Sequence, residues 1–147
     1  MPLAQLFPQL SGHNSYQISS PRTGDYNCIA WAALENDRWW WPDQHGIAYW
    51  PEAAPREETL DAFVCTFESL GYESCNNSVL ESGFEKIAIF TDSNGIPTHM
   101  ARQLQNGRWT SKVGKLEDIE HDLYALEGVA YGQVAAVLRR AIRAPTR

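Results

Sequence analysis

The sequence has few cysteines, no long apolar run and no excess of positive charge, and each shortage excludes a class of protein. Only three cysteines occur in 147 residues, none in a Cys-x-x-Cys pair, which argues against a disulfide scaffold or a structural zinc site. No window approaches the roughly 18 consecutive apolar residues that a membrane helix needs. The net charge is −6, so electrostatics gives no reason to expect nucleic acid or a membrane surface as a partner.

The N-terminus also lacks a secretion signal, because Met1 to Gln5 contain no basic segment followed by an apolar one. We therefore expect a cytoplasmic protein. The apolar fraction of 44% and the charged fraction of 20% are near globular averages, which excludes disorder, collagen and coiled coil. No residue pattern indicates a cofactor or a metal, and we expect neither.

Tryptophan is what the sequence has in excess. Five of its six tryptophans lie between Trp31 and Trp50, and a proline-rich stretch over residues 42–56 predicts a long loop beside them. The aromatic side chains either cap the hydrophobic core or form a wall that binds a peptide, a sugar or a nucleotide base. The candidate substrate-binding residues are Trp39, Trp40, Trp41, Tyr49 and Trp50.

Turn residues and apolar periodicity predict a single α+β domain. We expect an irregular arm over residues 1–24, the domain over 25–143 and a frayed tail over 144–147. An antiparallel meander of three strands is predicted over residues 86–112, with turns at Asp92-Ser93-Asn94-Gly95 and Asn106-Gly107. The predicted helices cover residues 28–36, 59–70, 118–126 and 134–142.

Cys28 and His99 form the candidate catalytic pair. Cys28 lies where a loop becomes a helix, and the unpaired backbone N–H groups at a helix start favour the nucleophilic thiolate. His99 lies on the second strand of the meander, where a neutral imidazole could take the thiol proton. The alternative is that Cys28 is a buried structural cysteine and that a neighbouring group satisfies His99.

A catalytic histidine is usually oriented by a third polar group. We rank Ser111 on the next strand first, followed by His121 and Asp118. The backbone N–H of Cys28 and one side-chain donor would form the oxyanion hole. Asn27 is the candidate donor; Tyr26 is equally near in sequence, and Gln17 could reach from the arm.

Six blocks of the sequence resemble a widespread family of small uncharacterised bacterial proteins, over most of residues 26–132. They are Tyr26-Asn27-Cys28-Ile29-Ala30-Trp31-Ala32, Arg38-Trp39-Trp40-Trp41-Pro42, Tyr49-Trp50-Pro51, Gly71-Tyr72-Glu73, Thr98-His99-Met100-Ala101-Arg102-Gln103 and Gly107-Arg108-Trp109-Thr110-Ser111-Lys112-Val113-Gly114.

The order of a cysteine on a helix, a histidine on a strand and a further strand is also similar to papain-like thiol hydrolases, which include peptidoglycan amidases and papain-fold toxin domains. This resemblance implies a papain-like arrangement, in which an N-terminal helix carrying Cys28 packs on an antiparallel sheet carrying His99, with C-terminal helices. It implies Cys28 as nucleophile and His99 as base. The sequence departs from the pattern because the strand after His99 has no Asn, Asp or His.

We therefore predict a cysteine hydrolase, a peptidase or amidase, that acts on a peptide or amide substrate. The alternative is a non-catalytic binding module on the same fold, whose tryptophan-rich surface contacts a protein partner. A toxin- or immunity-associated protein would be compatible with either hypothesis.

Overall fold

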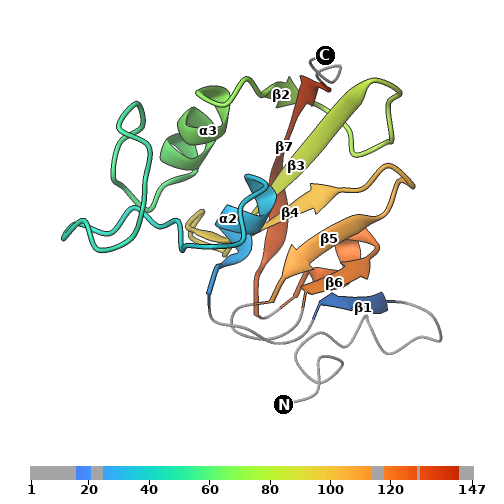
Figure 1. The fold of residues 1–147 in the computed structure, drawn as a ribbon, viewed down its shortest axis with the longest axis horizontal. Coiled ribbons are helices and arrows are strands. Elements are labelled where there is room, and N and C mark those ends of the chain that lie inside the picture. The colour runs from blue at the N-terminus through green and yellow to red at the C-terminus, as the bar shows by residue number, and fades with distance from the viewer. Residues whose placement is uncertain (1–15, 21–24, 114–117, 129, 143–147) are drawn as a thin grey trace.

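The structure is a computed structural model that describes residues 16–20, 25–113, 118–128 and 130–142. Its strands are β1 (Tyr16–Ser20), β2 (Glu73–Cys75), β3 (Phe84–Thr91), β4 (Pro97–Gln103), β5 (Trp109–Lys112), β6 (Asp118–His121) and β7 (Gln133–Ala141). Its helical segments are α2 (Cys28–Ala32), α3 (Leu60–Glu68) and the 3₁₀ turn η2 (Leu123–Leu126). The strands form one antiparallel sheet of seven, in the order β1-β6-β5-β4-β3-β7-β2 (Figure 1).

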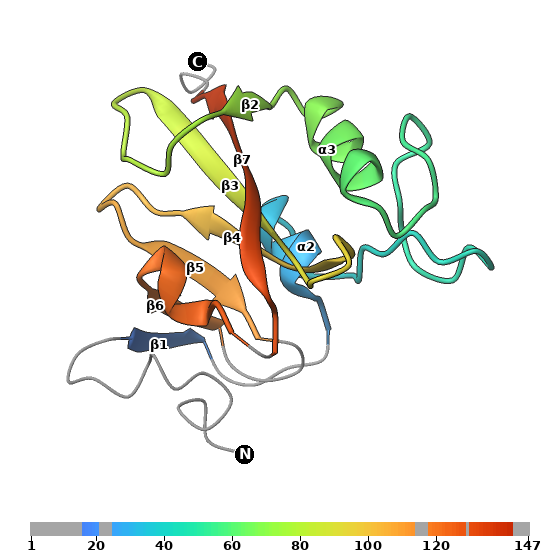
Figure 2. The ribbon, with the colours of Figure 1, turned by 180° about the vertical axis from the view of Figure 1, so that it is seen from behind.

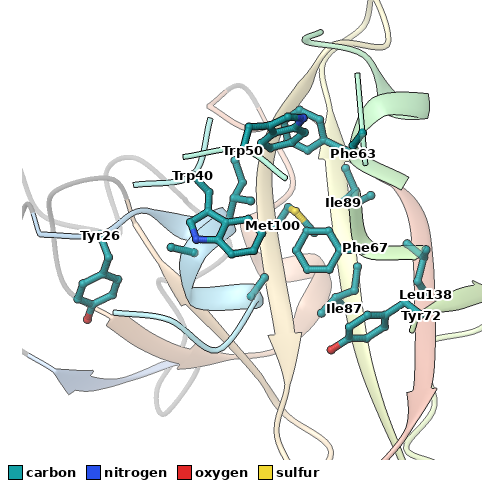
Figure 3. Packing of buried hydrophobic residues seen from close by; sticks show 14 residues of the cluster. Tyr26, Trp40, Trp50, Phe63, Phe67, Tyr72, Ile87, Ile89, Met100 and Leu138 are labelled. Atoms are coloured by element: carbon teal, nitrogen blue, oxygen red, sulfur yellow. The ribbon is translucent and has the colours of Figure 1, made fainter. Parts of the chain in front are cut away.

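Both faces of the sheet are covered. Side chains alternate between the two faces along a strand, so the register of β3 with β4 assigns each residue to a face. Ile89 pairs with Met100, and both lie in the apolar cluster beneath α2 and α3 (Figure 3). Phe90 pairs with His99, and Phe90 belongs to the cluster on the opposite face, where η2 packs (Figure 2). The helices and η2 therefore cover opposite faces.

The meander predicted over residues 86–112 is confirmed as β3, β4 and β5. Asp92 shapes the first turn, because its Oδ1 accepts hydrogen bonds from the backbone N–H groups of Asn94 at 2.9 Å and Ile96 at 3.0 Å. Gly95 supplies the positive φ of 78° that this turn needs and that other residues rarely adopt. Local turn chemistry is therefore sufficient to form this part of the sheet.

The helix predicted over residues 59–70 is confirmed as α3. Thr59 begins it, since its side chain accepts a hydrogen bond from the backbone N–H of Ala62 at 3.1 Å. Phe63 and Phe67 lie on the same helix face and are fully buried against the sheet. This apolar stripe makes α3 the main helix of the fold.

Two of the predicted helices are wrong. Residues 134–142 lie almost entirely in β7, which pairs with β3 along its length and carries β2 on its other edge. Residues 118–121 form β6, and only residues 123–126 are helical, as η2. The three-four spacing of valine and leucine in the last segment is compatible with a helix, but pairing with a buried neighbouring strand overrides that local preference.

The predicted papain-like arrangement is also wrong. The described residues form a sheet-dominated fold, and their C-terminal part adds strands where helices were expected. The helix that carries Cys28 has only five residues, because Ala33 caps it and Leu34 adopts a positive φ of 68°. A single short helix cannot form the helical layer that the papain-like expectation requires.

Residues 16–20, which lie in the segment expected to be an irregular arm, form β1 at one edge of the sheet and pair with β6. The other residues of that segment, 1–15 and 21–24, lie outside the described residues, as does the expected tail over residues 144–147. None of the helices described here is both long enough and apolar enough to cross a membrane.

Candidate functional site

Asn27 starts α2 and also anchors the tryptophan-rich loop. Its Oδ1 accepts hydrogen bonds from the backbone N–H groups of Ala30 at 3.2 Å and Trp40 at 3.1 Å, and its Nδ2 donates to the carbonyl oxygen of Trp40 at 2.8 Å. The side chain is only 4% exposed. The amide predicted as an oxyanion donor is therefore used to hold two chain segments together.

The tryptophans divide between the core and a pocket. Trp40 and Trp50 are 3% and 4% exposed and belong to the core cluster (Figure 3). Trp39 is 37% exposed, and Trp41 packs edge-on against Phe63 with 5.7 Å between ring centroids. Consecutive indoles thus alternate between buried and pocket-lining positions. Trp40 caps the core, as one hypothesis expected, and Trp39 and Trp41 form part of a wall, as the other expected.

A pocket of about 550 Å³ lies between the start of α2, the loop that follows it and the start of β4. Its surface is mostly apolar. It is lined by Asn27, Cys28, Trp39, Trp41, Asp43, His45, Ile47, Ala48, Thr98 and Tyr131. We call it the Trp39/Trp41 pocket.

An ion pair fixes the outer wall of the Trp39/Trp41 pocket. Arg56 lies 3.2 Å from Asp43 Oδ1 and donates to the carbonyl oxygens of Asp43 at 2.7 Å and Ala48 at 2.8 Å. The Asp43 carboxylate accepts the backbone N–H groups of Ile47 at 2.8 Å and Ala48 at 2.9 Å, and these bonds lower the pKa of Asp43. These contacts define the shape of the loop.

Cys28 lies in this pocket as a half-buried side chain. Burial raises the pKa of its thiol to about 11 and outweighs the backbone N–H groups of Met100 and Ile29, which favour the thiolate. The thiol is consequently protonated near pH 7. This is opposite to the activated thiolate expected at a helix start.

Cys28 is expected to react with iodoacetamide more slowly than Cys75 at pH 8. A rise in pKa from 9.0 to about 11 reduces the thiolate fraction about 100-fold, and the thiolate is the reacting species. Mass spectrometry of timed digests would give both rates, with the urea-unfolded protein as the control in which the difference should disappear. Faster labelling of Cys28 in the folded protein would instead indicate an activated nucleophile.

His99 lies on the opposite face of the sheet from α2. It is 1% exposed, and its ring stacks on Tyr131 with centroids 4.0 Å apart and planes 5° apart. Neither ring nitrogen has a hydrogen-bond partner among the described residues. Burial lowers the pKa of His99 well below its usual value, so the ring is neutral. The structure therefore does not bring Cys28 and His99 into a hydrogen bond. Tyr131 lies between the two sites, because its ring stacks on His99 and it also lines the Trp39/Trp41 pocket that contains Cys28.

Ser111 is paired with His121 and not with His99. Ser111 Oγ lies 2.7 Å from His121 Nε2, and His121 Nδ1 lies 2.7 Å from the carbonyl oxygen of Asp122. Because a carbonyl only accepts, Nδ1 donates and Nε2 accepts the serine hydroxyl. Burial lowers the pKa of His121 to about 4, and both side chains are fully buried. This neutral pair is closed to substrate.

Asp118, the remaining candidate for the third residue, points to the face that carries α2. It accepts a hydrogen bond from the hydroxyl of Tyr26, another buried residue on that face. The predicted set is therefore divided, with Cys28 and Asp118 on one face and His99 and Ser111 on the other. Sequence reasoning missed Ile47, Thr98 and Tyr131, and no local motif marks them as pocket residues.

A comparison with protein-family models gives a match. The family model described as "Domain of unknown function (DUF7689)" covers residues 17–139, in agreement with the resemblance to an uncharacterised family. Neither the curated proteins nor the solved structures include a match, and the papain-like resemblance gains no support. Within the described part of the chain, no group of three or more His, Cys, Asp or Glu residues is placed to hold a metal ion.

Proposed function

Because the chain belongs to the DUF7689 family, whose description assigns no activity, we propose from the site itself that this protein is a binding module. The Trp39/Trp41 pocket would hold an apolar or aromatic side chain of a protein partner. The observation that supports this proposal is the pocket of about 550 Å³ with mostly apolar walls. Ligand sites are typically concave and apolar and have volumes of roughly 300–1,000 Å³.

Three polar side chains that line the pocket are already bonded within the protein, which favours an apolar occupant. Asn27 uses its amide to bind Trp40, and Asp43 uses its carboxylate to bind its own loop and Arg56. The Thr98 hydroxyl hydrogen bonds to the carbonyl oxygen of Tyr131. A charged or strongly polar ligand group would lose water on entering and gain few hydrogen bonds in return.

The rim of the pocket favours a protein as the source of that side chain. Ile47 is 86% exposed on a loop that the Asp43–Arg56 contacts hold in place, and Trp39 is 37% exposed beside it. Nearby, the Arg38 guanidinium lies 3.6 Å from the ring centroid of Tyr49. Tryptophan, tyrosine and arginine are the residues most enriched in binding hot spots of protein interfaces.

The same geometry disfavours the cysteine hydrolase predicted from the sequence. A nucleophilic cysteine needs a thiolate and a base within hydrogen-bond reach. Here the pKa of the Cys28 thiol is raised to about 11, and His99 lies on the other face, where its ring makes no hydrogen bond to a described residue. We therefore place the binding module ahead of the hydrolase.

Titration with N-phenyl-1-naphthylamine, a neutral aromatic dye that fluoresces in apolar sites, tests the proposal. We expect saturable binding of one dye per chain, weakened at least about ten-fold by Ile47→Asp because the substitution puts a carboxylate at the pocket mouth. The matched control is Ile96→Asp, which changes another exposed isoleucine, 39% exposed, that does not line the pocket. Peptides carrying Trp, Phe or Leu should displace the dye, and a serine-only peptide should not.

Absence of saturable binding would overturn the proposal. Equal binding by both aspartate variants would do the same, because the dye would then occupy another surface. Circular dichroism of each variant shows whether a loss of binding comes with a loss of fold.

A further inference from the structure

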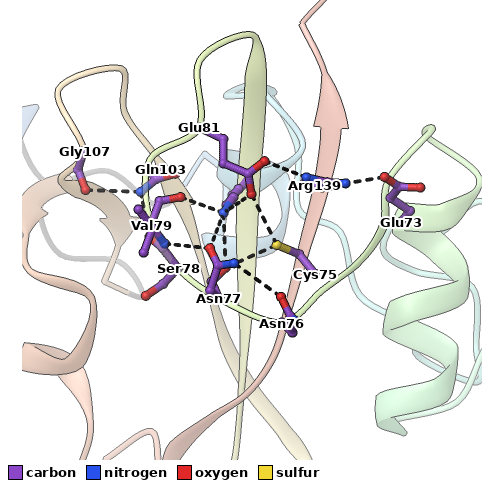
Figure 4. A network of polar contacts seen from close by, with 11 residues as sticks. Glu73, Cys75, Asn76, Asn77, Ser78, Val79, Glu81, Gln103, Gly107 and Arg139 are labelled. Carbon is purple, nitrogen blue, oxygen red and sulfur yellow. Dashed lines mark hydrogen bonds and ion pairs between the residues drawn. The ribbon is translucent and has the colours of Figure 1, made fainter.

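A fully buried lysine that does not line the Trp39/Trp41 pocket contacts an amide and a carboxylate. The Lys86 side chain on β3 is 0% exposed. Its Nζ lies 2.8 Å from Asn77 Oδ1 and 2.8 Å from Glu81 Oε1, and it donates to the carbonyl oxygen of Val79 at 2.6 Å. The three residues that contact this amine, Asn77, Val79 and Glu81, all belong to the loop that joins β2 to β3 and are labelled in Figure 4.

The Asn77 amide is held at both ends. Its Oδ1 also accepts the backbone N–H of Val79 at 3.1 Å, and its Nδ2 donates to Asn76 Oδ1 at 3.3 Å. A backbone N–H on a carbonyl oxygen stabilises the negative charge that develops there when a nucleophile attacks the carbon. Asn77 Oδ1 therefore accepts hydrogen bonds from both the Lys86 amine and a backbone N–H, and these bonds polarise the side-chain carbonyl next to that amine.

We propose that Lys86 and Asn77 become joined by an intramolecular isopeptide bond. Lys86 Nζ attacks Asn77 Cγ, the new C–N bond forms, and the bond from Cγ to Nδ2 breaks. Of the three protons on the lysine ammonium, one stays on the new amide and two leave with Nδ2 as ammonium. The exchange conserves charge and needs no oxidant, reductant or cofactor.

Each neighbouring group has a part in this step. Holding amine and amide together replaces a bimolecular encounter, which accelerates such reactions strongly. Glu81 can relay protons from Nζ to the leaving nitrogen, and its contact with Lys86 lowers its pKa, so it begins as the carboxylate that accepts them. Arg139, 2.6 Å from Glu81, also favours the carboxylate form. Asn77 is exposed, so ammonia can leave into solvent.

Intact-mass spectrometry of the purified wild-type chain, incubated at pH 9, is the test. We expect a mass about 17 Da below the sequence mass, equal to the loss of one ammonia, and a digest that contains one branched peptide joining Asn77 to Lys86. Glu81→Gln is expected to slow the reaction by at least about ten-fold, because it removes the proton relay.

Succinimide formation at the Asn94-Gly95 or Asn106-Gly107 turns would cause the same loss of mass, so Lys86→Met is the control. The loss should disappear in Lys86→Met and remain in Lys112→Met, which changes another fully buried lysine. An unchanged wild-type mass would overturn the proposal, and so would a mass loss without the branched peptide. The wild-type measurement decides the question even if a variant fails to fold.

Discussion

Replacing Gly132 with alanine is expected to lower the free energy of unfolding by about 3 kcal/mol or more. Gly132 has a φ of +79°, and a Cβ built on it would lie 2.0 Å from the carbonyl oxygen of Thr91. That oxygen is backbone and cannot move without disturbing β3. Gly132 also exchanges two backbone hydrogen bonds with Gly128, at 2.7 and 2.9 Å, which the same displacement would break.

Gly46→Ala is the matched control for this substitution. Gly46 has a similar φ of +69°, but no atom of the residues that the structure describes lies within 4 Å of the position of its Cβ. Only the backbone strain is left, worth about 1 kcal/mol. Urea unfolding of both variants gives the comparison, and equal losses of stability would show that the close approach of Gly132 to Thr91 is absent in solution.

Asn27→Ala is expected to cost about 3 kcal/mol of stability and to abolish dye binding in the Trp39/Trp41 pocket. The substitution removes the cap of α2 and leaves the backbone N–H and carbonyl of Trp40 buried without partners. Since those bonds tie the loop to α2, the pocket wall loses its position as well. Urea unfolding and dye titration measure the two effects.

Thr59→Ala provides the control for a lost cap alone. Thr59 caps α3 through one bond, to the backbone N–H of Ala62 at 3.1 Å, and within the described part of the chain its side chain holds no other segment. Its loss should cost about 1 kcal/mol and leave dye binding unchanged. If Asn27→Ala behaved like Thr59→Ala in both measurements, Asn27 would be only a helix cap and the account of the pocket would be wrong.

Local patterns were enough to predict part of the fold. The strands β3, β4 and β5 follow from apolar runs separated by Asp92-Ser93-Asn94-Gly95 and Asn106-Gly107, where nearby atoms form the turn. The helix α3 follows from Phe63 and Phe67 on one face and the cap at Thr59. The last segment, β7, was predicted as a helix because its pairing with β3 depends on residues far away in the sequence.

For the candidate site, the sequence by itself determined which residues could carry chemistry and that Cys28 would begin a helix beside a tryptophan-rich loop. Only the tertiary structure decided that His99 faces away from that helix, because a side chain's face depends on the register of its strand with its neighbours. It also decided that the Cys28 thiol stays protonated, because the pKa reflects burial by segments distant in sequence. The excess of tryptophan was visible from composition. That Trp40 lies in the core and Trp39 at a pocket depends on the tertiary structure, because the hydrogen bonds between Asn27 and the backbone of Trp40 fix this part of the loop against α2.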